Sequence, residues 1–243
     1  MLTRPQNPPP VREQALATVS AVSAAVQRAG RPAASITLIA VSKFQPVPAI
    51  REAHAAGLEH FGENYVQEGV AKVQALQDLP LTWHFIGALQ TNKTRAVAAN
   101  FAWVHTVDRL QIAERLSAQR PVNLPPLQVC LQVMLVPEPG KAGLAPADVL
   151  ALAAAVANLP GLQLRGLMCI PPATADVPTQ REHFRALANL LAELQSAGLA
   201  VDTLSMGMSG DYEAAILEGA THVRIGTAIF GARPPPTEAA GPA

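Results

Sequence analysis

The sequence contains little that is typical of a secreted, disulfide-stabilised protein. Only two of its 243 residues are cysteines, and aromatic residues make up 4%. Two cysteines are too few for a disulfide framework, so we expect Cys130 and Cys169, which lie in apolar strand-like runs, to be buried thiols. The polar, proline-rich segment 1–10 has neither the apolar core nor the small-residue cleavage site of a secretory signal. These features predict a reducing, cytoplasmic location.

The sequence also lacks an excess of one charge and any long apolar run. Its 18 lysines and arginines balance its 18 aspartates and glutamates. No basic stripe with interleaved aromatic residues is present, which argues against a nucleic-acid partner. The longest apolar stretches are the length of strands, well short of the roughly 20 residues that a membrane helix needs. The histidines have no metal-ligand spacing, so we expect no metal site.

What the sequence does contain is a regular alternation of two patterns. Short runs rich in apolar and β-branched residues occur at 36–43, 60–65, 82–87, 103–108, 127–135, 164–170, 201–207 and 222–230. Helical spacing of apolar residues fills most of the gaps, at 46–56, 65–76, 93–99, 109–119, 145–157, 179–197 and 211–218, and a leading helix is expected at 11–29.

Eight strands and seven helices, with the leading helix to complete the ring, predict an α/β fold of the closed (β/α)8 TIM-barrel type. An open doubly wound sheet is the alternative, but no Gly-x-Gly-x-x-Gly turn follows the first strand. No linker interrupts the alternation, so we expect residues 11–231 to form one domain. Segments 1–10 and 232–243 are predicted to be disordered, because their composition cannot bury a core.

Lys43 closes the first apolar run, and strand alternation places its side chain on the same face as Ile39 and Val41. If this face is the barrel interior, the amine lies at the C-terminal mouth, where barrel enzymes carry their chemistry. Desolvation and a neighbouring cation would favour the neutral amine there, and a neutral amine attacks aldehydes. The structural alternative is a lysine at a strand end that extends into solvent.

Two later segments offer groups for an anion. Arg224 lies between two apolar residues and is expected to point toward the mouth, with Gly226 and Thr227 just beyond it; its structural alternative is an ion pair with a barrel carboxylate. Ser209 lies near the expected start of a helix, where amides attract phosphate, although it could simply cap that helix. An amine that can form an imine and a phosphate cradle together indicate pyridoxal 5′-phosphate as the ligand.

Three more polar residues end the second and third strands. Asn64 could hydrogen-bond a ring hydroxyl, and His84 is expected to be an interior histidine satisfied by a backbone carbonyl. Glu63 is the obvious candidate base for a different function, in which a barrel acts on sugar phosphates without a cofactor.

Seven motifs, in order along nearly the whole chain, resemble the pyridoxal phosphate homeostasis proteins, single-domain relatives of the alanine racemase N-terminal barrel. They are Ala-Val-Ser-Lys at 40–43, Phe-Gly-Glu-Asn-Tyr at 61–65, Trp-His-Phe-Ile-Gly at 83–87, Leu-Gln-Thr-Asn-Lys at 89–93, Gly-Leu-Met at 166–168, Leu-Ser-Met-Gly-Met-Ser at 204–209 and Val-Arg-Ile-Gly-Thr-Ala-Ile-Phe-Gly at 223–231.

The resemblance implies a role for each of six residues: Lys43 holds pyridoxal 5′-phosphate as a Schiff base, Ser209, Gly226 and Thr227 bind its phosphate, Arg224 lies near its pyridine nitrogen, and Asn64 lies beside its ring. It also implies a monomer that acts in intracellular pyridoxal phosphate homeostasis, with delivery of the cofactor to apoenzymes as a further role. Transfer would proceed when another amine displaces the lysine.

An arginine beside the pyridine nitrogen disfavours its protonation, which makes the cofactor a weaker electron sink. Racemisation also needs a second acid or base on the far face of the imine. In alanine racemase-like enzymes this is a tyrosine from a further domain, which the chain is too short to include, and neither Tyr65 nor Tyr212 matches it. We therefore expect binding without catalysis, with a minimal amino-acid racemase as the alternative.

The chain departs from the family pattern at the rim of the fifth strand. Met134 stands where relatives usually carry asparagine, and Ala88 replaces a frequent proline. Lys141 and Gly143 keep the later Lys-x-Gly of that segment. These differences concern the rim and leave the lysine and phosphate motifs intact.

Overall fold

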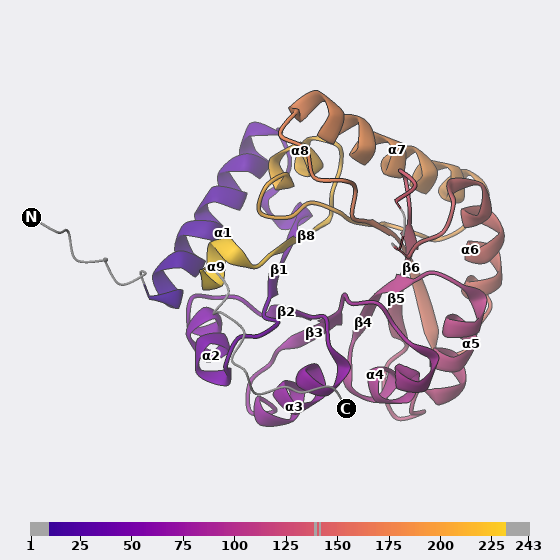
Figure 1. Ribbon diagram of the computed structural model, residues 1–243, viewed down its shortest axis with the longest axis horizontal. Helices are drawn as coiled ribbons and strands as arrows, with labels where there is room; N and C mark the ends of the chain where they lie inside the picture. Colours follow the sequence, from indigo (N-terminus) through magenta and orange to yellow (C-terminus); the bar gives the residue numbers. More distant parts are fainter. Residues whose placement is uncertain (1–9, 139, 141, 232–243) are drawn as a thin grey trace, which may run out of the picture.

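The computed structural model describes residues 10–138, 140 and 142–231. Within them, eight parallel strands close into a barrel in which each strand pairs with its neighbour in the sequence and the first pairs with the last. Helices surround this barrel, as the view down its axis shows (Figure 1). The predicted (β/α)8 barrel is confirmed.

The strands are short and lie close to their predicted positions. They are β1 (Thr37–Val41), β2 (His60–Glu63), β3 (Thr82–Phe85), β4 (Trp103–Val107), β5 (Leu127–Val133), β6 (Leu162–Cys169), β7 (Thr203–Ser205) and β8 (His222–Ile225).

The helices that follow the strands are α2 (Val47–Ala55), α3 (Val66–Ala75), α4 (Thr94–Asn100), α5 (Leu110–Gln119), α6 (Val149–Ala157), α7 (Val177–Ser196), α8 (Tyr212–Leu217) and α9 (Thr227–Phe230). The leading helix α1 (Val11–Arg28) lies against α2, α8 and α9, so it completes the ring as predicted (Figure 1). The described ranges also contain three short segments of 3-10 helix, η1 (Ala33–Ser35), η2 (Thr91–Lys93) and η3 (Pro146–Asp148). No helix in the described ranges is long and apolar enough to cross a bilayer.

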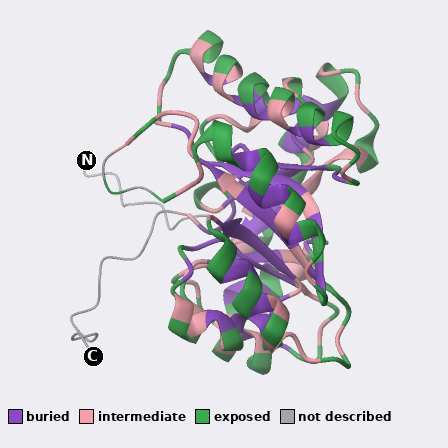
Figure 2. Cartoon of the chain, turned by 90° about the vertical axis from the view of Figure 1, so that its right-hand side faces the viewer, coloured by how far each residue is buried: buried purple, intermediate pink, exposed green. Residues whose placement is uncertain are grey.

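The two faces of the barrel strands differ in chemistry. Outward-facing residues such as Phe61 and Phe85 join the helices in one large apolar core, which Figure 2 shows as buried strands under helices with exposed outer faces. The interior instead holds a small cluster around Trp103 and several buried polar side chains. Cys130 and Cys169 are buried free thiols, as predicted, and burial raises the pKa of both to about 12.

The C-terminal end of the last strand was predicted incorrectly. The strand expected over 222–230 ends at Ile225, because Gly226 leaves the extended conformation (φ −116°, ψ −69°). The carbonyl of Gly226 then accepts the amides of Ile229 and Phe230, both at 2.9 Å, which closes α9. The segments predicted to be disordered, 1–10 and 232–243, lie outside the described residues apart from Pro10, so the domain limits stay predictions.

We expect Phe85→Ala to lower the free energy of unfolding by about 3–5 kcal/mol, because it empties a fully buried site. The Phe85 ring meets the Phe101 ring edge-on at 5.5 Å between centroids. Urea denaturation followed by circular dichroism would measure the change. Leu150→Ala on α6, where the side chain is 50% exposed, is the control and should stay within about 0.5 kcal/mol of the parent protein. Equal midpoints for both variants would contradict this description of the core.

Candidate functional site

The C-terminal ends of β1, β2 and β8 meet at one rim of the barrel. Val41 is in register with Gly62, and Ala40 with Ile225. Lys43 therefore follows β1 directly beside the residues that follow β2 and β8. The structure brings the predicted residues Lys43, Asn64, Gly226 and Thr227 onto adjacent loops, while Ser209 lies on the next loop, after β7.

Lys43 does not lie within the first strand, which was expected to include it. β1 ends at Val41, and the amide of Ser42 makes one further bond to Gly62 O at 2.9 Å. Phe44 then adopts φ +64°, a left-handed conformation that costs a non-glycine residue about 1–3 kcal/mol unless its surroundings hold it. The Phe44 amide donates to Glu68 Oε1 at 2.6 Å, so the turn that carries Lys43 is held on both sides.

A buried network under this turn was not predicted from the sequence. Lys72 Nζ donates to Ser42 O at 2.6 Å, to Glu63 Oε1 at 2.8 Å and to Glu68 Oε1 at 2.6 Å. The Ser42 hydroxyl also donates to Glu63 Oε1, at 2.6 Å. The only sequence signal is the i, i+4 spacing of Glu68 and Lys72 on one helix. Neither the spacing nor the motifs indicate that Lys72 reaches a strand-end carbonyl.

Glu63 lies in this network and not at the mouth. It is in register with outward-facing Phe85, and a Cβ on Gly69 of α3 would lie 3.1 Å from its Cβ. Burial raises the pKa of this carboxyl, against the opposing effects of Lys72 and Ser42. The sugar-phosphate hypothesis needed Glu63 as a base at the mouth, and the structure removes it from that position.

Arg224 occupies the barrel interior near the C-terminal end of β8, as its alternation predicted. It is 4% exposed, and its guanidinium donates to Ser205 Oγ at 2.8 Å and to Cys169 O at 2.9 Å. Its hydrogen-bond partners among the described residues are thus neutral, so the alternative of a direct ion pair with a barrel carboxylate is wrong. Burial lowers its pKa, yet a guanidinium stays charged in proteins.

Asn64 follows β2, and its side-chain oxygen is buried without a hydrogen-bond partner among the described residues. A buried unpaired oxygen costs free energy, and such a group calls for a donor. Asn64 also lines a cavity of about 250 Å³ at the mouth with Ala88 and Met134. Met134 packs against Gly143, whose added Cβ would lie 3.0 Å from Met134 Cβ, whereas Lys141 lies outside the described residues.

The loops after β7 and β8 hold the predicted phosphate residues. Gly226 passes β1 so closely that an added Cβ would lie 3.2 Å from Val41 O, and Thr227 begins α9. Ser209 is exposed and lies near the start of α8, as expected, three residues before Tyr212. The residue that precedes α8 is Asp211, whose carboxylate accepts the Met208 amide at 2.6 Å.

His84 lies inside the barrel as predicted, but the backbone carbonyl that was expected as its hydrogen-bond partner is wrong. It contacts the rings of His60 and His105, both at 2.9 Å between nitrogens, and no carbonyl bond to it is found within the described ranges. Among all the residues that the structure describes, no group of three or more histidine, cysteine, aspartate or glutamate side chains could hold a metal ion.

We expect Lys72→Met to destabilise the protein by about 3–5 kcal/mol, because it leaves the Glu63 carboxyl buried without its cation. Thermal or urea unfolding would measure this. The double variant Glu63→Gln with Lys72→Met removes both members of the pair and should recover most of the loss. An unchanged unfolding midpoint for Lys72→Met alone would show that the ion pair does not support the turn.

Comparison with known proteins identifies the chain's relatives. Residues 18–234 match the family described as alanine racemase, N-terminal domain. The chain is 57% identical over 223 residues to the pyridoxal phosphate homeostasis protein of Pseudomonas aeruginosa, which covers 92% of this chain and 96% of that protein. It is 54% identical over 215 residues to the protein of the same name from Escherichia coli K12, with coverages of 87% and 92%.

Solved structures agree with this relationship. PipY of Synechococcus elongatus PCC7942, solved with pyridoxal phosphate bound, aligns with a TM-score of 0.79 at 43% identity and covers 91% of this chain and 100% of PipY. Alanine racemase from Corynebacterium glutamicum shares the fold, with a TM-score of 0.65 at 18% identity over 90% of this chain and 60% of that enzyme. The chain belongs to the pyridoxal phosphate homeostasis protein family, whose fold is that of the alanine racemase N-terminal domain.

Proposed function

We propose that this chain binds pyridoxal 5′-phosphate at the C-terminal mouth of its barrel and acts in intracellular pyridoxal phosphate homeostasis. One observation carries the proposal: an amine, a buried guanidinium and a buried amide oxygen without a partner among the described residues belong to adjacent strand ends. These are Lys43 after β1, Arg224 on β8 and Asn64 after β2. The family relationship and the bound cofactor of PipY support the same ligand.

The residues at the rim fit this cofactor group by group. When bound, pyridoxal phosphate supplies an aldehyde that condenses with an amine and releases water. Lys43 Nζ is the proposed attachment point, and Asn64 Oδ1 would accept from the ring hydroxyl. The glycine backbone at Gly226 and the hydroxyls of Ser209 and Thr227 would hold the phosphate, to which a helix start such as that of α9 adds unpaired amides.

Arg224 favours binding over catalysis. A guanidinium that faces the ring nitrogen keeps that nitrogen unprotonated, because a second positive charge beside it is unfavourable. An unprotonated ring withdraws electrons weakly, so carbanion chemistry at the substrate carbon is slow. We propose a non-catalytic monomer that holds the cofactor on Lys43 and releases it to pyridoxal phosphate-dependent apoenzymes when their own lysine displaces Lys43.

We expect Lys43→Ala to lose the violet absorbance band of the bound cofactor and to retain at least tenfold less cofactor through gel filtration. Borohydride treatment should fix the cofactor on the parent protein at Lys43, which peptide mass spectrometry would locate. Lys93→Ala, which removes another lysine near the mouth, is the control and should keep the band. A modified lysine other than Lys43, or an unchanged Lys43→Ala spectrum, would overturn the attachment point.

The racemase alternative needs a second proton-transfer group at the mouth, and Tyr65 is the tyrosine that lies nearest to the turn of Lys43. Its exposed ring meets that of Phe44 at 5.1 Å between centroids. We expect the cofactor-loaded protein to exchange the α-hydrogen of L-alanine in heavy water no faster than free cofactor does, as NMR would measure. Exchange well above that rate, and lost in Tyr65→Phe, would establish the racemase.

A further inference from the structure

A continuous chain of hydrogen bonds runs through the barrel interior, starting from Arg224. The guanidinium donates to Ser205 Oγ at 2.8 Å, and Ser205 Oγ meets His105 Nδ1 at 2.8 Å. His105 Nε2 meets His84 Nδ1 at 2.9 Å, and His84 Nε2 meets His60 Nδ1 at 2.9 Å. Each member comes from a different strand: Arg224 from β8, Ser205 from β7, His105 from β4, His84 from β3 and His60 from β2. None of the three histidines has a role in the proposed cofactor site.

The central part of this chain is closed off from solvent. Ser205, His105 and His84 are each 0% exposed. The ring of Trp103 stacks on His84, with centroids 5.5 Å apart and planes 20° from parallel, and lies 5.6 Å from the His105 ring. Because bulk water does not reach these bonds, each donor must find its acceptor within the chain.

The hydrogen bonds can point in only one direction. An arginine donates and never accepts, so Ser205 Oγ is the acceptor of Arg224. Within the described residues, the Ser205 hydroxyl contacts one other partner, His105 Nδ1, which must therefore take its hydrogen. A neutral His105 then carries its proton on Nε2 and donates to His84, and His84 in turn donates from Nε2 to His60. In this arrangement each hydrogen bond of the chain has one donor hydrogen and one acceptor atom.

The charge state of the histidines agrees with this order. Burial lowers the pKa of His84 and of His105 well below the usual value. Neighbouring imidazoles lower the pKa of His84 further, and His222 and Arg224 do the same for His105. The pKa of His60 is also lowered by burial, against the raising effect of Glu59. All three rings are thus neutral at neutral pH. Hydrogen bonds aligned in one direction strengthen one another in a low-dielectric interior.

His222 is another titratable side chain packed against this chain, while Cys169, Asp211 and Cys130 act electrostatically on Arg224. Its ring lies 6.0 Å from that of His105, and it bonds to Thr221 at 3.0 Å instead of joining the chain. Burial lowers its pKa to about 4, with Arg165 and Asp202 acting in opposite directions on it. His222 is thus an interior histidine outside the hydrogen-bond chain, and its substitution is a matched control for substitutions of His84 and His105.

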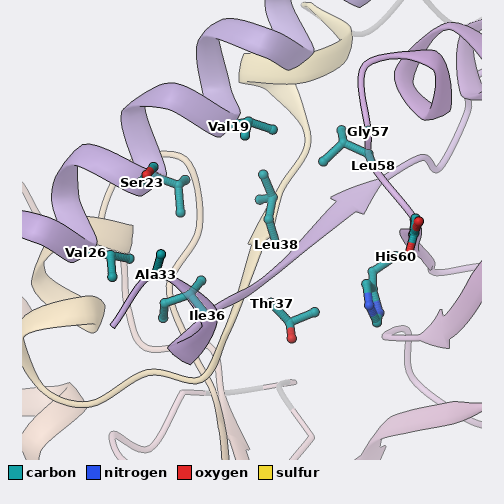
Figure 3. Close-up of a pocket in the computed structure, with 12 residues that line it drawn as sticks. Val19, Ser23, Val26, Ala33, Ile36, Thr37, Leu38, Gly57, Leu58 and His60 are labelled. Atoms are coloured by element: carbon teal, nitrogen blue, oxygen red, sulfur yellow. The ribbon is translucent and has the colours of Figure 1, made fainter. Parts of the chain in front are cut away.

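The far end of the chain opens on a cavity at the opposite end of the barrel from the mouth. His60 begins β2 and lines a cavity of about 360 Å³ between α1, the start of β1 and the connection from α2 to β2. Figure 3 shows His60 on one side of this cavity, with Leu38 and Val19 among the apolar side chains of its walls.

We propose that Ser205, His105 and His84 are positioning residues for Arg224: their one-directional hydrogen-bond chain fixes the guanidinium against the ring nitrogen of the cofactor and links that nitrogen to the His60 cavity. Because the Ser205 hydroxyl donates its hydrogen to His105, its oxygen becomes more negative and accepts the Arg224 hydrogen bond more strongly. The hydrogen bonds from His105 to His84 and from His84 to His60 increase this polarisation. An interruption at His84 therefore weakens the hold on Arg224 although it touches neither Arg224 nor Ser205. This inference rests on the proposed function, since Arg224 needs the cofactor as its partner.

The test uses full-length protein loaded with pyridoxal phosphate labelled with ¹⁵N in the ring. We expect the ring nitrogen to remain unprotonated in the parent protein. In His105→Phe and His84→Phe its titration midpoint should rise by roughly one pH unit, the size of effect that one hydrogen bond produces. His84→Gln, which offers both an acceptor and a donor, should restore the parent midpoint, and His222→Phe should leave it unchanged.

Equal midpoints in His84→Phe and His222→Phe would overturn the proposal, because a general loosening of the interior would then explain any shift. A second measurement needs neither a variant nor the cofactor: ¹⁵N NMR of the histidine rings should find protons on Nε2 of His105 and His84. A proton on Nδ1 of His105 would overturn the direction of the chain. Failure of the parent protein to take up labelled cofactor would instead overturn the proposed function, while the histidine spectra would still decide the order of the bonds.

Discussion

The ion pair between Lys72 and Glu63 is the interaction on which the geometry of the mouth depends. Its lysine binds the carbonyl that precedes Lys43, and its partner carboxylate accepts the Ser42 hydroxyl. Burying two charges is costly, and the cost is offset only when both find several partners in good geometry. Lys72 has three oxygen acceptors, and Glu63 Oε1 accepts from both Lys72 and Ser42. Glu63 Oε2 is buried without a hydrogen-bond partner among the described residues, so the carboxylate meets this condition only in part. These bonds fix the strand-end carbonyl of Ser42, directly before Lys43.

A parallel barrel places chemistry at one end because all its strands point the same way. Residues from β1, β2 and β8 reach the same rim although they are far apart in the sequence. The interior of the barrel contributes differently. Beside the small cluster around Trp103 it holds polar side chains that bond to one another, and Arg224 at the end of β8 belongs to this network. The cation at the mouth is thus set by residues deep in the barrel as well as by its immediate neighbours.

Much of the fold could be predicted from the sequence, because each repeat carries the same local signal of an apolar run followed by a helical pattern. The inward direction of Arg224 also followed from simple alternation. The exceptions have a common cause. The turn at Phe44 uses a left-handed conformation that favours glycine, the short helix α9 depends on Gly226 leaving the strand, and Lys72 acts through contacts with residues up to 30 positions away. Local patterns contain no information about such contacts.

Closure of the ring has a consequence for how the chain is made. β1 pairs with β8 from Thr37 opposite His222, and α1 packs on α9, where the Thr18 hydroxyl reaches Ala228 O at 3.2 Å. Within the barrel, the first elements to be synthesised are therefore neighbours of the last. During synthesis β1 has a free edge until β8 emerges, and the loop after β8, which is proposed to hold the phosphate, emerges later still. The nascent protein can form its lysine turn early, but the proposed mouth is complete only after β8 has emerged.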